Sequence, residues 1–296
     1  MIDNIKANAV YGAIAGDIIG SIYESNPCLK DKVYKFPLWT GKAKLSAHEH
    51  ESQRTGSRYT DDTVTGLALA KACMKLGSFE NEETVKEIFA ENMRDLCVKY
   101  EWAGYGSRFW IWLTAPKGNA NRLPYNSYGN GSAMRVFPIG LLFSSLEETQ
   151  RVARLSAEIS HNHEQGIKGA QAVASVMFLA RTGKSKNEIR RYVIETYADD
   201  EYYHMDKSCD EIRQTYSFDL SCQGSVPESI QCFLEGNSYE ECVRLAVSLG
   251  GDADTMGCIT GAMAACMYPV PKKIIKQVQK RLPEELIQII DKWNNS

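Results

Sequence analysis

The sequence lacks an apolar run long enough to cross a membrane, and it lacks stretches of alternating apolar and polar residues that predict β-strands. A membrane helix needs about 18 to 20 consecutive apolar residues, so we expect no membrane-spanning segment. The N-terminal MIDNIKANAVYGAIAGD has early acidic residues and no basic segment ahead of an apolar core, which argues against a secretion signal. We therefore expect a cytoplasmic protein.

No strong excess of charge of either sign is present. The 296 residues include 34 Lys and Arg against 37 Asp and Glu, a formal net charge of −3. Because a large positive charge draws a protein to polyanions, nucleic acid is not the expected partner unless the fold creates a local basic patch. Hydrophobic residues make up 44% and charged residues 24% of the chain, an ordinary globular composition that can bury a sizeable core.

The nine cysteines include no CxxC pair, and an odd number cannot all be joined in disulfides within the chain. Several lie inside apolar helical patterns. We expect reduced thiols, as is usual in the cytosol.

Apolar residues recur at three- and four-residue intervals along most of the chain, which predicts many amphipathic helices. Three long irregular stretches, 25–59, 114–131 and 198–226, lack the low-complexity composition of a linker, so we predict a single all-α domain over 1–296. The expected helices are 5–23, 63–76, 81–99, 133–143, 147–159, 164–182, 186–197, 227–235, 239–248, 255–267 and 284–293.

Two expected helices begin with acidic clusters, TDDT at 60–63 and DADT at 252–255. The ordinary interpretation of one such cluster is helix capping. One cap needs only one side chain, however, and here neighbouring carboxylates and hydroxyls are supplied twice. Hard oxygen donors without cysteine or histidine favour Mg²⁺, Mn²⁺ or Ca²⁺ over zinc, and two ions could share them at roughly 3.5–4 Å. The candidate ligands are Thr60, Asp61, Asp62, Asp252, Asp254 and Thr255.

Small residues accompany both clusters: Gly66 follows the first, Gly257 and Gly261 follow the second, and GAIAGDIIG occupies 12–20. Packing alone explains such glycines, since small residues let helices approach closely. Close packing would also draw the two acidic helix ends together.

Five blocks of the sequence resemble, in the same order, the ADP-ribosylglycohydrolase family, which is related to the dinitrogenase-reductase-activating glycohydrolase and the ADP-ribosyl-acceptor hydrolases. The combination of TDDT with GGDADT is a specific signal for the family, whereas any one block alone is weak evidence. The blocks are GAIAGDIIGSIYE (12–24), YTDDT (59–63), YNSYGNGSAMRV (125–136), SHNHEQGIKGA (160–170) and SLGGDADTMG (248–257).

The resemblance implies a compact orthogonal bundle of many helices with a dinuclear Mg²⁺ or Mn²⁺ centre, held by the six candidate ligands and holding the hydroxyls of the distal ribose. Asp61 and Asp62 are thereby also catalytic candidates. Glu24 matches a family glutamate that we expect to position or deprotonate the attacking water or to gate substrate entry. An exposed loop glutamate is otherwise only a solvated charge. For Asp17 we expect a structural hydrogen bond.

Gly129, Asn130, Gly131 and Ser132 end a loop and begin the expected helix AMRVFPIGLL. By itself such a run is usually a turn with an N-cap. The resemblance raises it to a diphosphate cradle of backbone amides at a positive helix end, with Tyr128 beside the adenine or ribose.

The resemblance assigns Ser160, His161 and Gly166 to contacts with ADP-ribose, whereas His163 has no such assignment and is expected to cap its helix. His161 and His163 alone do not complete a zinc site. Gly104, Tyr105 and Gly106, in EWAGYGSRFW, are candidates for the same pocket, although an aromatic turn is also ordinary packing. The segment CQGSVP at 222–227 is a candidate for its rim.

The expected function is metal-dependent hydrolysis of the glycosidic bond between ADP-ribose and an acceptor, by a monomer, with ADP-ribose as product. The substrate is an ADP-ribosylated protein, nucleobase or small molecule. Arginine is favoured as acceptor only by analogy with bacterial relatives. Two alternatives stay open: a dinuclear phosphohydrolase that cleaves the pyrophosphate, and a catalytically silent relative that binds ADP-ribose or is structural.

Overall fold

The computed structural model describes residues 4–24, 36–41 and 56–296. Within these ranges the chain forms fifteen α-helices and two 3-10 helices, and its β-type pairing is limited to two isolated bridges. The expected all-α fold is therefore confirmed. No helix in these ranges is long and apolar enough to span a membrane.

The helices, in chain order, are α1 (Ile5–Gly20), α2 (Asp61–Lys75), α3 (Glu82–Cys97), η3 (Val98–Ala103), α4 (Ser107–Thr114), η4 (Ala120–Arg122), α5 (Gly131–Met134), α6 (Phe137–Gly140), α7 (Leu146–Glu158), α8 (Glu164–Arg181), α9 (Lys186–Thr196), α10 (Cys209–Thr215), α11 (Cys222–Glu235), α12 (Tyr239–Ser248), α13 (Ala253–Ala265), α14 (Lys272–Gln279) and α15 (Glu284–Asn294).

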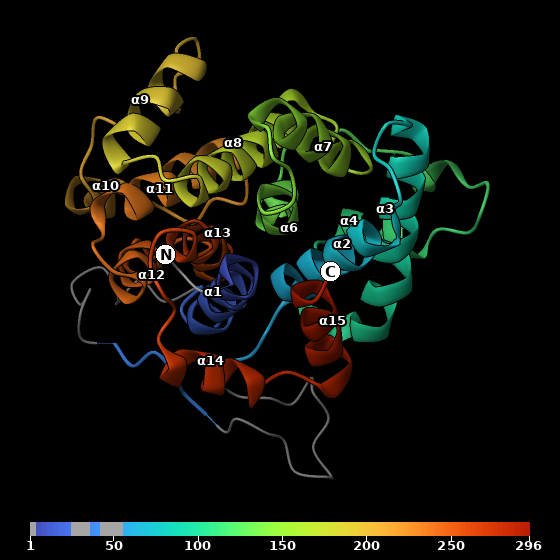
Figure 1. Ribbon diagram of the computed structural model, residues 1–296, viewed down its shortest axis with the longest axis horizontal. Helices are drawn as coiled ribbons and strands as arrows, with labels where there is room; N and C mark the ends of the chain where they lie inside the picture. The colour runs from blue at the N-terminus through green and yellow to red at the C-terminus, as the bar shows by residue number, and fades with distance from the viewer. Residues whose placement is uncertain (1–3, 25–35, 42–55) are drawn as a thin grey trace.

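Helices α1 and α13 pack side by side at the centre of the molecule (Figure 1). Their backbones are in contact: a Cβ atom added to Gly16 would lie 1.9 Å from the carbonyl oxygen of Gly257, and one added to Gly20 would lie 2.1 Å from that of Ala253. Only glycine permits this approach. The expected role of the small residues in close helix packing is confirmed.

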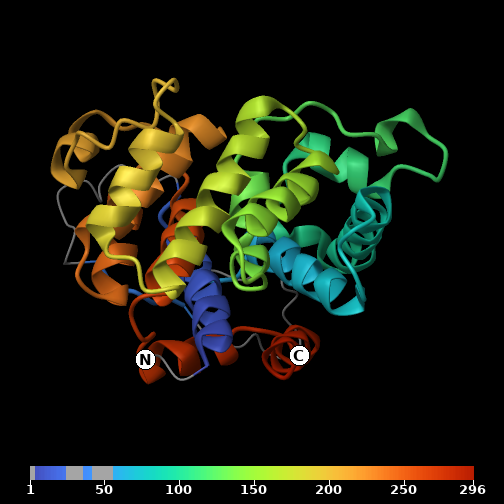
Figure 2. The same cartoon turned by 45° about the horizontal axis from the view of Figure 1, so that its top comes forward.

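The other helices surround this central pair (Figures 1 and 2). Helices α11 and α12 pack against α13, α2 packs against α3, and α7 lies along α8. The C-terminal helices α14 and α15 cover α1 on the side that lies at the bottom of Figure 1. This arrangement leaves the beginnings of α2 and α13 near the same part of α1.

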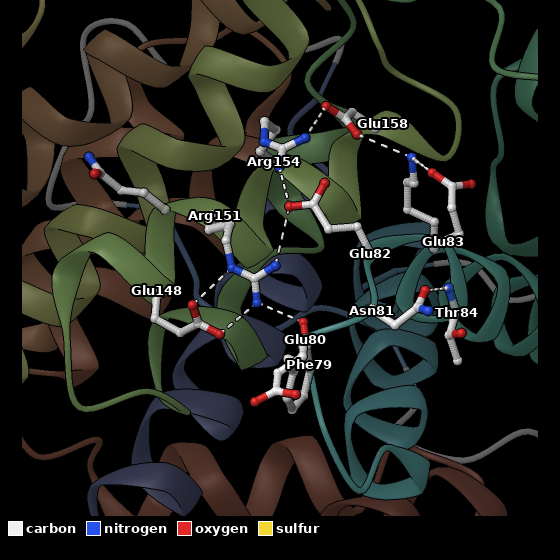
Figure 3. Close-up of polar contacts among 12 residues, drawn as sticks. Phe79, Glu80, Asn81, Glu82, Glu83, Thr84, Glu148, Arg151, Arg154 and Glu158 are labelled. Carbon is white, nitrogen blue, oxygen red and sulfur yellow. Dashed lines mark hydrogen bonds and ion pairs between the residues drawn. The ribbon is translucent and has the colours of Figure 1, made fainter.

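An ion-pair network joins α3 to α7 on the surface (Figure 3). Arg154 of α7 contacts Glu82 of α3 at 2.6 Å and Glu158 at 2.7 Å, and Arg151 contacts Glu82 at 3.2 Å. Exposed pairs of this kind each stabilise a protein by about 0–1 kcal/mol, so the network contributes only modestly to the contact between α3 and α7. The chain leaves α7 toward His161.

Several predicted boundaries were wrong. The single helix expected over 133–143 is two four-residue helices, α5 and α6. Pro138 lies in the first turn of α6, where its missing N–H costs no hydrogen bond. Helix α11 begins at Cys222 rather than at Pro227. Helices α4, α10 and α14 were not predicted, since seven or eight residues give too little periodicity to recognise.

The eight cysteines in the described ranges all carry free thiols and are all buried. This agrees with the expected reduced state. Cys28 and most of the irregular stretch 25–59 lie outside the described residues.

Candidate active site

Asp17, buried on α1, holds the beginning of α2. Its carboxylate accepts hydrogen bonds from the backbone amides of Thr60 and Thr63, at 3.1 and 3.2 Å, and from both threonine hydroxyls. A carboxylate from another helix thus satisfies amides that a helix start leaves free. The expected structural hydrogen bond of Asp17 is confirmed, and four donors already occupy its two oxygens.

The N-cap side chains of the two acidic clusters do not cap their helices. Thr60 is the N-cap of α2 and Asp252 is the N-cap of α13, and neither side chain makes a capping hydrogen bond. Asp252 Oδ2 instead accepts from Asn130 Nδ2 at 2.6 Å. The capping interpretation therefore leaves these side chains unexplained.

The two clusters meet in the folded chain. Thr255 Oγ1 lies 3.4 Å from Asp62 Oδ2, which joins the start of α13 to the start of α2. Carboxylate oxygens of Asp17, Asp62 and Asp254 lie within 4.8 Å of one another, and so do those of Glu24, Asp252 and Asp254. Side chains almost 200 positions apart in the chain thus form one acidic site, as the sequence predicts.

Burial and mutual repulsion raise the carboxyl pKa values in this site. Burial, followed by the charge of Asp254, raises the pKa of Asp62 well above its ordinary value, and burial with the charge of Asp252 does the same for Asp254. Burial raises the pKa of Asp252 to about 6. Full ionisation at neutral pH therefore requires a compensating positive charge.

The donor set fits divalent cations. Asp62 Oδ1 is buried and has no hydrogen-bond partner among the described residues. Among the same residues, no Lys or Arg forms an ion pair with Asp17 or with the four aspartates of the two clusters. Hard oxygen ligands suit Mg²⁺ or Mn²⁺. Thr60, Asp61, Asp62, Asp252, Asp254 and Thr255 would hold the ions, with Asp17 as their support.

The acidic site forms one side of a cavity of about 410 Å³. Asn130, which bonds to Asp252, belongs to the glycine-rich loop (residues 129–132) on the other side of the cavity. His161 and the buried Arg135 line the cavity beside this loop. The cavity thus has an acidic side and a side with cationic and neutral donors. Of the predicted site residues, those that line it are Glu24, Thr60, Asp61, Asp62, Gly104, Gly106, Gly129, Asn130, Gly131, His161, Asp252, Asp254 and Thr255.

Two predicted aromatic contacts lie outside the cavity lining. Tyr105 turns its hydroxyl toward the carbonyl oxygen of Cys97, at 3.2 Å, and stacks on Trp110. Tyr128 is 51% exposed and contacts the ring of His163. His163 caps α8 as expected, since its side chain accepts a hydrogen bond from the amide of Gln165.

Three further predicted residues stand behind the lining. Ser132 Oγ donates to the carbonyl oxygen of Gly166 at 2.7 Å, and Ser160 Oγ lies between Arg135 and His161. A Cβ atom on Gly166 would lie 2.7 Å from the carbonyl oxygen of His161, so glycine is needed there for packing. The structure gives these positions a supporting place.

The rim beside the glycine-rich loop differs from the predicted one. Gly129 forms a bridge with Ser221, and the amide of Asn130 donates to the carbonyl oxygen of Leu220 at 2.8 Å. Phe218 and Leu220, about half exposed, line the cavity. The segment 222–227 is instead the first part of α11, and none of its residues lines the cavity.

Sequence reasoning missed a set of basic and aromatic lining residues. Arg135 belongs to the YNSYGNGSAMRV block and directly follows the glycine-rich run, which was a usable signal. Tyr125 begins the same block, and Arg108 and Phe109 belong to EWAGYGSRFW, so these three also lay in segments that the sequence singled out. Arg58 and Phe218 join the cavity only through the fold. The missed residues are Arg58, Arg108, Phe109, Tyr125, Arg135 and Phe218.

The model of the family described as ADP-ribosylglycohydrolase matches residues 3–295. The chain belongs to the ADP-ribosylglycohydrolase family. Family membership supports hydrolysis of linkages to ADP-ribose, with ADP-ribosylated substrates and ADP-ribose as product.

Individual relatives are distant. The chain is 27% identical over 317 residues to ADP-ribosylhydrolase ARH3 of Mus musculus, covering 87% of this chain and 82% of the relative. It is 23% identical over 275 residues to ADP-ribosylarginine hydrolase Tri1 of Pseudomonas putida (strain GB-1), covering 88% and 70%. A solved structure titled ADP-ribosylglycohydrolase-related protein complex superimposes with a TM-score of 0.69 at 21% identity, over 99% of this chain and 97% of that one. This last likeness supports the shared fold.

Proposed function

We propose that this ADP-ribosylglycohydrolase hydrolyses the glycosidic bond between the distal ribose of ADP-ribose and an acceptor, with two Mg²⁺ or Mn²⁺ ions held by the six ligands named above. The observation that carries the proposal is the meeting of the α2 and α13 acidic starts at one side of a cavity, with the buried Asp62 Oδ1 unpartnered among the described residues. When bound, the ions would supply positive charge that orients ribose hydroxyls and stabilises charge developing at the reacting bond.

The chain's own groups divide the remaining work. Glu24 lies within 4.8 Å of carboxylate oxygens of Asp252 and Asp254, so it can accept a proton from a water that attacks the anomeric carbon. The glycine-rich loop and His161 offer donors to the diphosphate. Phe218 and Leu220 offer an apolar rim to the base. In this proposal, a substrate held by these contacts has its glycosidic bond beside the acidic side.

The acceptor leaves through the cavity mouth. We propose an ADP-ribosylated arginine, serine, nucleobase or small molecule as the substrate, with arginine as the first acceptor to test. The relatives at hand carry both the general name ADP-ribosylhydrolase and the arginine-specific one. A panel of arginine-, serine- and guanine-linked ADP-ribose substrates, each incubated with the protein and followed by chromatography of the products, identifies the acceptor by which one is cleaved.

The products also separate the competing activities. Free ADP-ribose, formed with Mg²⁺ or Mn²⁺ and lost with EDTA, supports the proposal. AMP with ribose phosphate would instead show a pyrophosphate-cleaving enzyme. Binding of ADP-ribose without turnover of any substrate would show a silent relative. Against the silent alternative, Glu24 and all six ligand positions carry functional side chains and line the cavity.

A further inference from the structure

Arg135, Ser160 and His161 form a chain of contacts behind the glycine-rich loop. Arg135 Nη2 donates to Ser160 Oγ at 2.9 Å and to the carbonyl oxygen of Ser156 at 2.8 Å. Ser160 Oγ lies 2.8 Å from His161 Nδ1. All three side chains are buried. Their donor and acceptor roles can therefore be assigned from the contacts themselves.

Arg135 fixes the direction of the hydrogen bonds among these three side chains. A guanidinium has donors only, so Ser160 Oγ accepts from Arg135 and its own hydrogen must go elsewhere. His161 Nδ1 is the one acceptor that contacts this hydroxyl among the described residues. If Nδ1 carried a hydrogen, the buried serine hydrogen would lose its acceptor, which is unfavourable. His161 Nδ1 therefore accepts, and Nε2 carries the hydrogen of the neutral ring.

The opposite ring nitrogen faces the glycine-rich loop. A Cβ atom added to Gly131 would lie 2.9 Å from His161 Nε2, and one added to Gly129 would lie 3.6 Å away. No acceptor for Nε2 is found among the described residues, and His161 lines the cavity. Burial, followed by the charge of Arg135, lowers the pKa of His161 well below its ordinary value, so the ring stays neutral at neutral pH.

We propose that Arg135 and Ser160 are positioning residues that hold His161 as the Nε2–H tautomer, so that it donates to a diphosphate oxygen of the substrate at the glycine-rich loop. The inference rests on the proposed function, because the diphosphate is that of ADP-ribose. Arg135 forms no ion pair among the described residues, so its charge also favours an anion on this side of the cavity.

The first test reads the tautomer of His161 in the wild-type protein. Two-bond ¹H–¹⁵N correlation spectra of the full chain, with ¹⁵N-labelled histidine, report which ring nitrogen carries the hydrogen. The chain has five histidines, and a spectrum of His161→Asn identifies the signals of interest. We expect the Nε2–H form for His161 at neutral pH. A ring with hydrogen on Nδ1, or on both nitrogens, overturns the proposal.

The second test removes the hydroxyl of Ser160, which joins Arg135 to His161. In Ser160→Ala, His161 should shift toward a mixture of tautomers, and the Kd for ADP-ribose should rise about 10-fold or more, with KM raised and kcat largely kept. Ser156→Ala is the matched control: this serine is equally buried on α7, and its side chain donates to the carbonyl oxygen of Ala153. Arg135→Lys, which keeps a cationic donor, should lose less affinity than Arg135→Met.

Two results are decisive for this relay of hydrogen bonds from Arg135 through Ser160 to His161. A folded Ser160→Ala with an unchanged tautomer and unchanged Kd overturns it, and equal losses in Ser160→Ala and Ser156→Ala do the same. Failure of the proposed function has another signature: the wild-type protein releases no ADP-ribose from any substrate, yet inorganic pyrophosphate still perturbs the Nε2–H signal of His161. That pattern supports the relay and rejects the hydrolase.

Discussion

Asp17 on α1 accepts hydrogen bonds from both the backbone amide and the side-chain hydroxyl of Thr60, the N-cap residue of α2. Because α1 also packs backbone to backbone against α13, this pair joins one acidic cluster to the helix that carries the other. The geometry of the acidic site therefore depends on a residue that is not among its expected cation ligands.

For Asp17→Asn we expect weaker cation binding and, with Mn²⁺ present, a lower Tm, although Asp17 is not an expected ligand. An amide has one acceptor oxygen where the carboxylate uses two, and a hydrogen bond to a charged group contributes about 1.5–3 kcal/mol. Calorimetric titration with Mn²⁺ and thermal melts by circular dichroism measure both effects. A destabilised variant with wild-type Mn²⁺ affinity would show that Asp17 supports only the fold.

Asp61→Ala and Asp254→Ala should each weaken cation binding and abolish turnover while the helical fold is kept. Without cations, both variants should melt at higher temperature than the wild-type protein, because one repelling carboxylate has been removed. The exposed Asp95→Asn on α3 serves as the control and should change neither property. Wild-type rates in Asp61→Ala or Asp254→Ala would rule out the ligand assignment.

Glu24→Gln should bind Mn²⁺ with little change and lose rate by about 10²- to 10⁴-fold, the usual contribution of a general base. The substitution keeps the size of the side chain and removes its ability to take a proton. Single-turnover kinetics with saturating substrate isolates this step. If the rate is unchanged while Asp254→Ala is inactive, Glu24 has no part in the proton transfer.

The cation-free protein should become less stable as pH rises from about 5 to 8. The folded pKa values of Asp252 and Asp17 are raised to about 6 and about 7, above an unfolded value of about 3.9. Their contribution is thus present at low pH and lost as pH passes through the folded pKa. Cation affinity should rise over the same range, since the ligands must lose protons. Melts in EDTA and Mn²⁺ titrations check both slopes; a Tm that rises from pH 5 to 8 contradicts the expectation.

Gly16→Ala should destabilise the protein by about 1–3 kcal/mol or more and weaken Mn²⁺ binding, because the added methyl would press on the backbone of Gly257 and separate α1 from α13. Gly77→Ala is a suitable control, since a Cβ there meets nothing within 4 Å. Urea unfolding with Mn²⁺ titration measures both variants. Equal stability in the two would mean that the contact of α1 with α13 tolerates a side chain.

The helical class of the fold was predictable because apolar spacing is local, and α3 and α15, each buried along one face, are long enough to show it. Short helices were not predictable: α10 has seven residues, and its start is fixed by a reciprocal cap between Ser208 and Glu211 rather than by periodicity. In the same way, Pro138 ended an apparently continuous helix that the apolar pattern alone could not divide.

By itself, the sequence determined the chemistry that is available: neighbouring carboxylates and hydroxyls before two helices, and glycines spaced to let helices touch. Tertiary structure decided which of these groups act together. Packing of α1 on α13, together with the hydrogen bonds from the start of α2 to Asp17, brings Asp62 and Asp254 close. The contacts of Arg135 and Ser160 set the donor direction at His161. The physical reason is that composition and spacing act over a few residues, whereas repulsion, burial and hydrogen-bond direction depend on neighbours that the folded chain supplies from far away in the sequence.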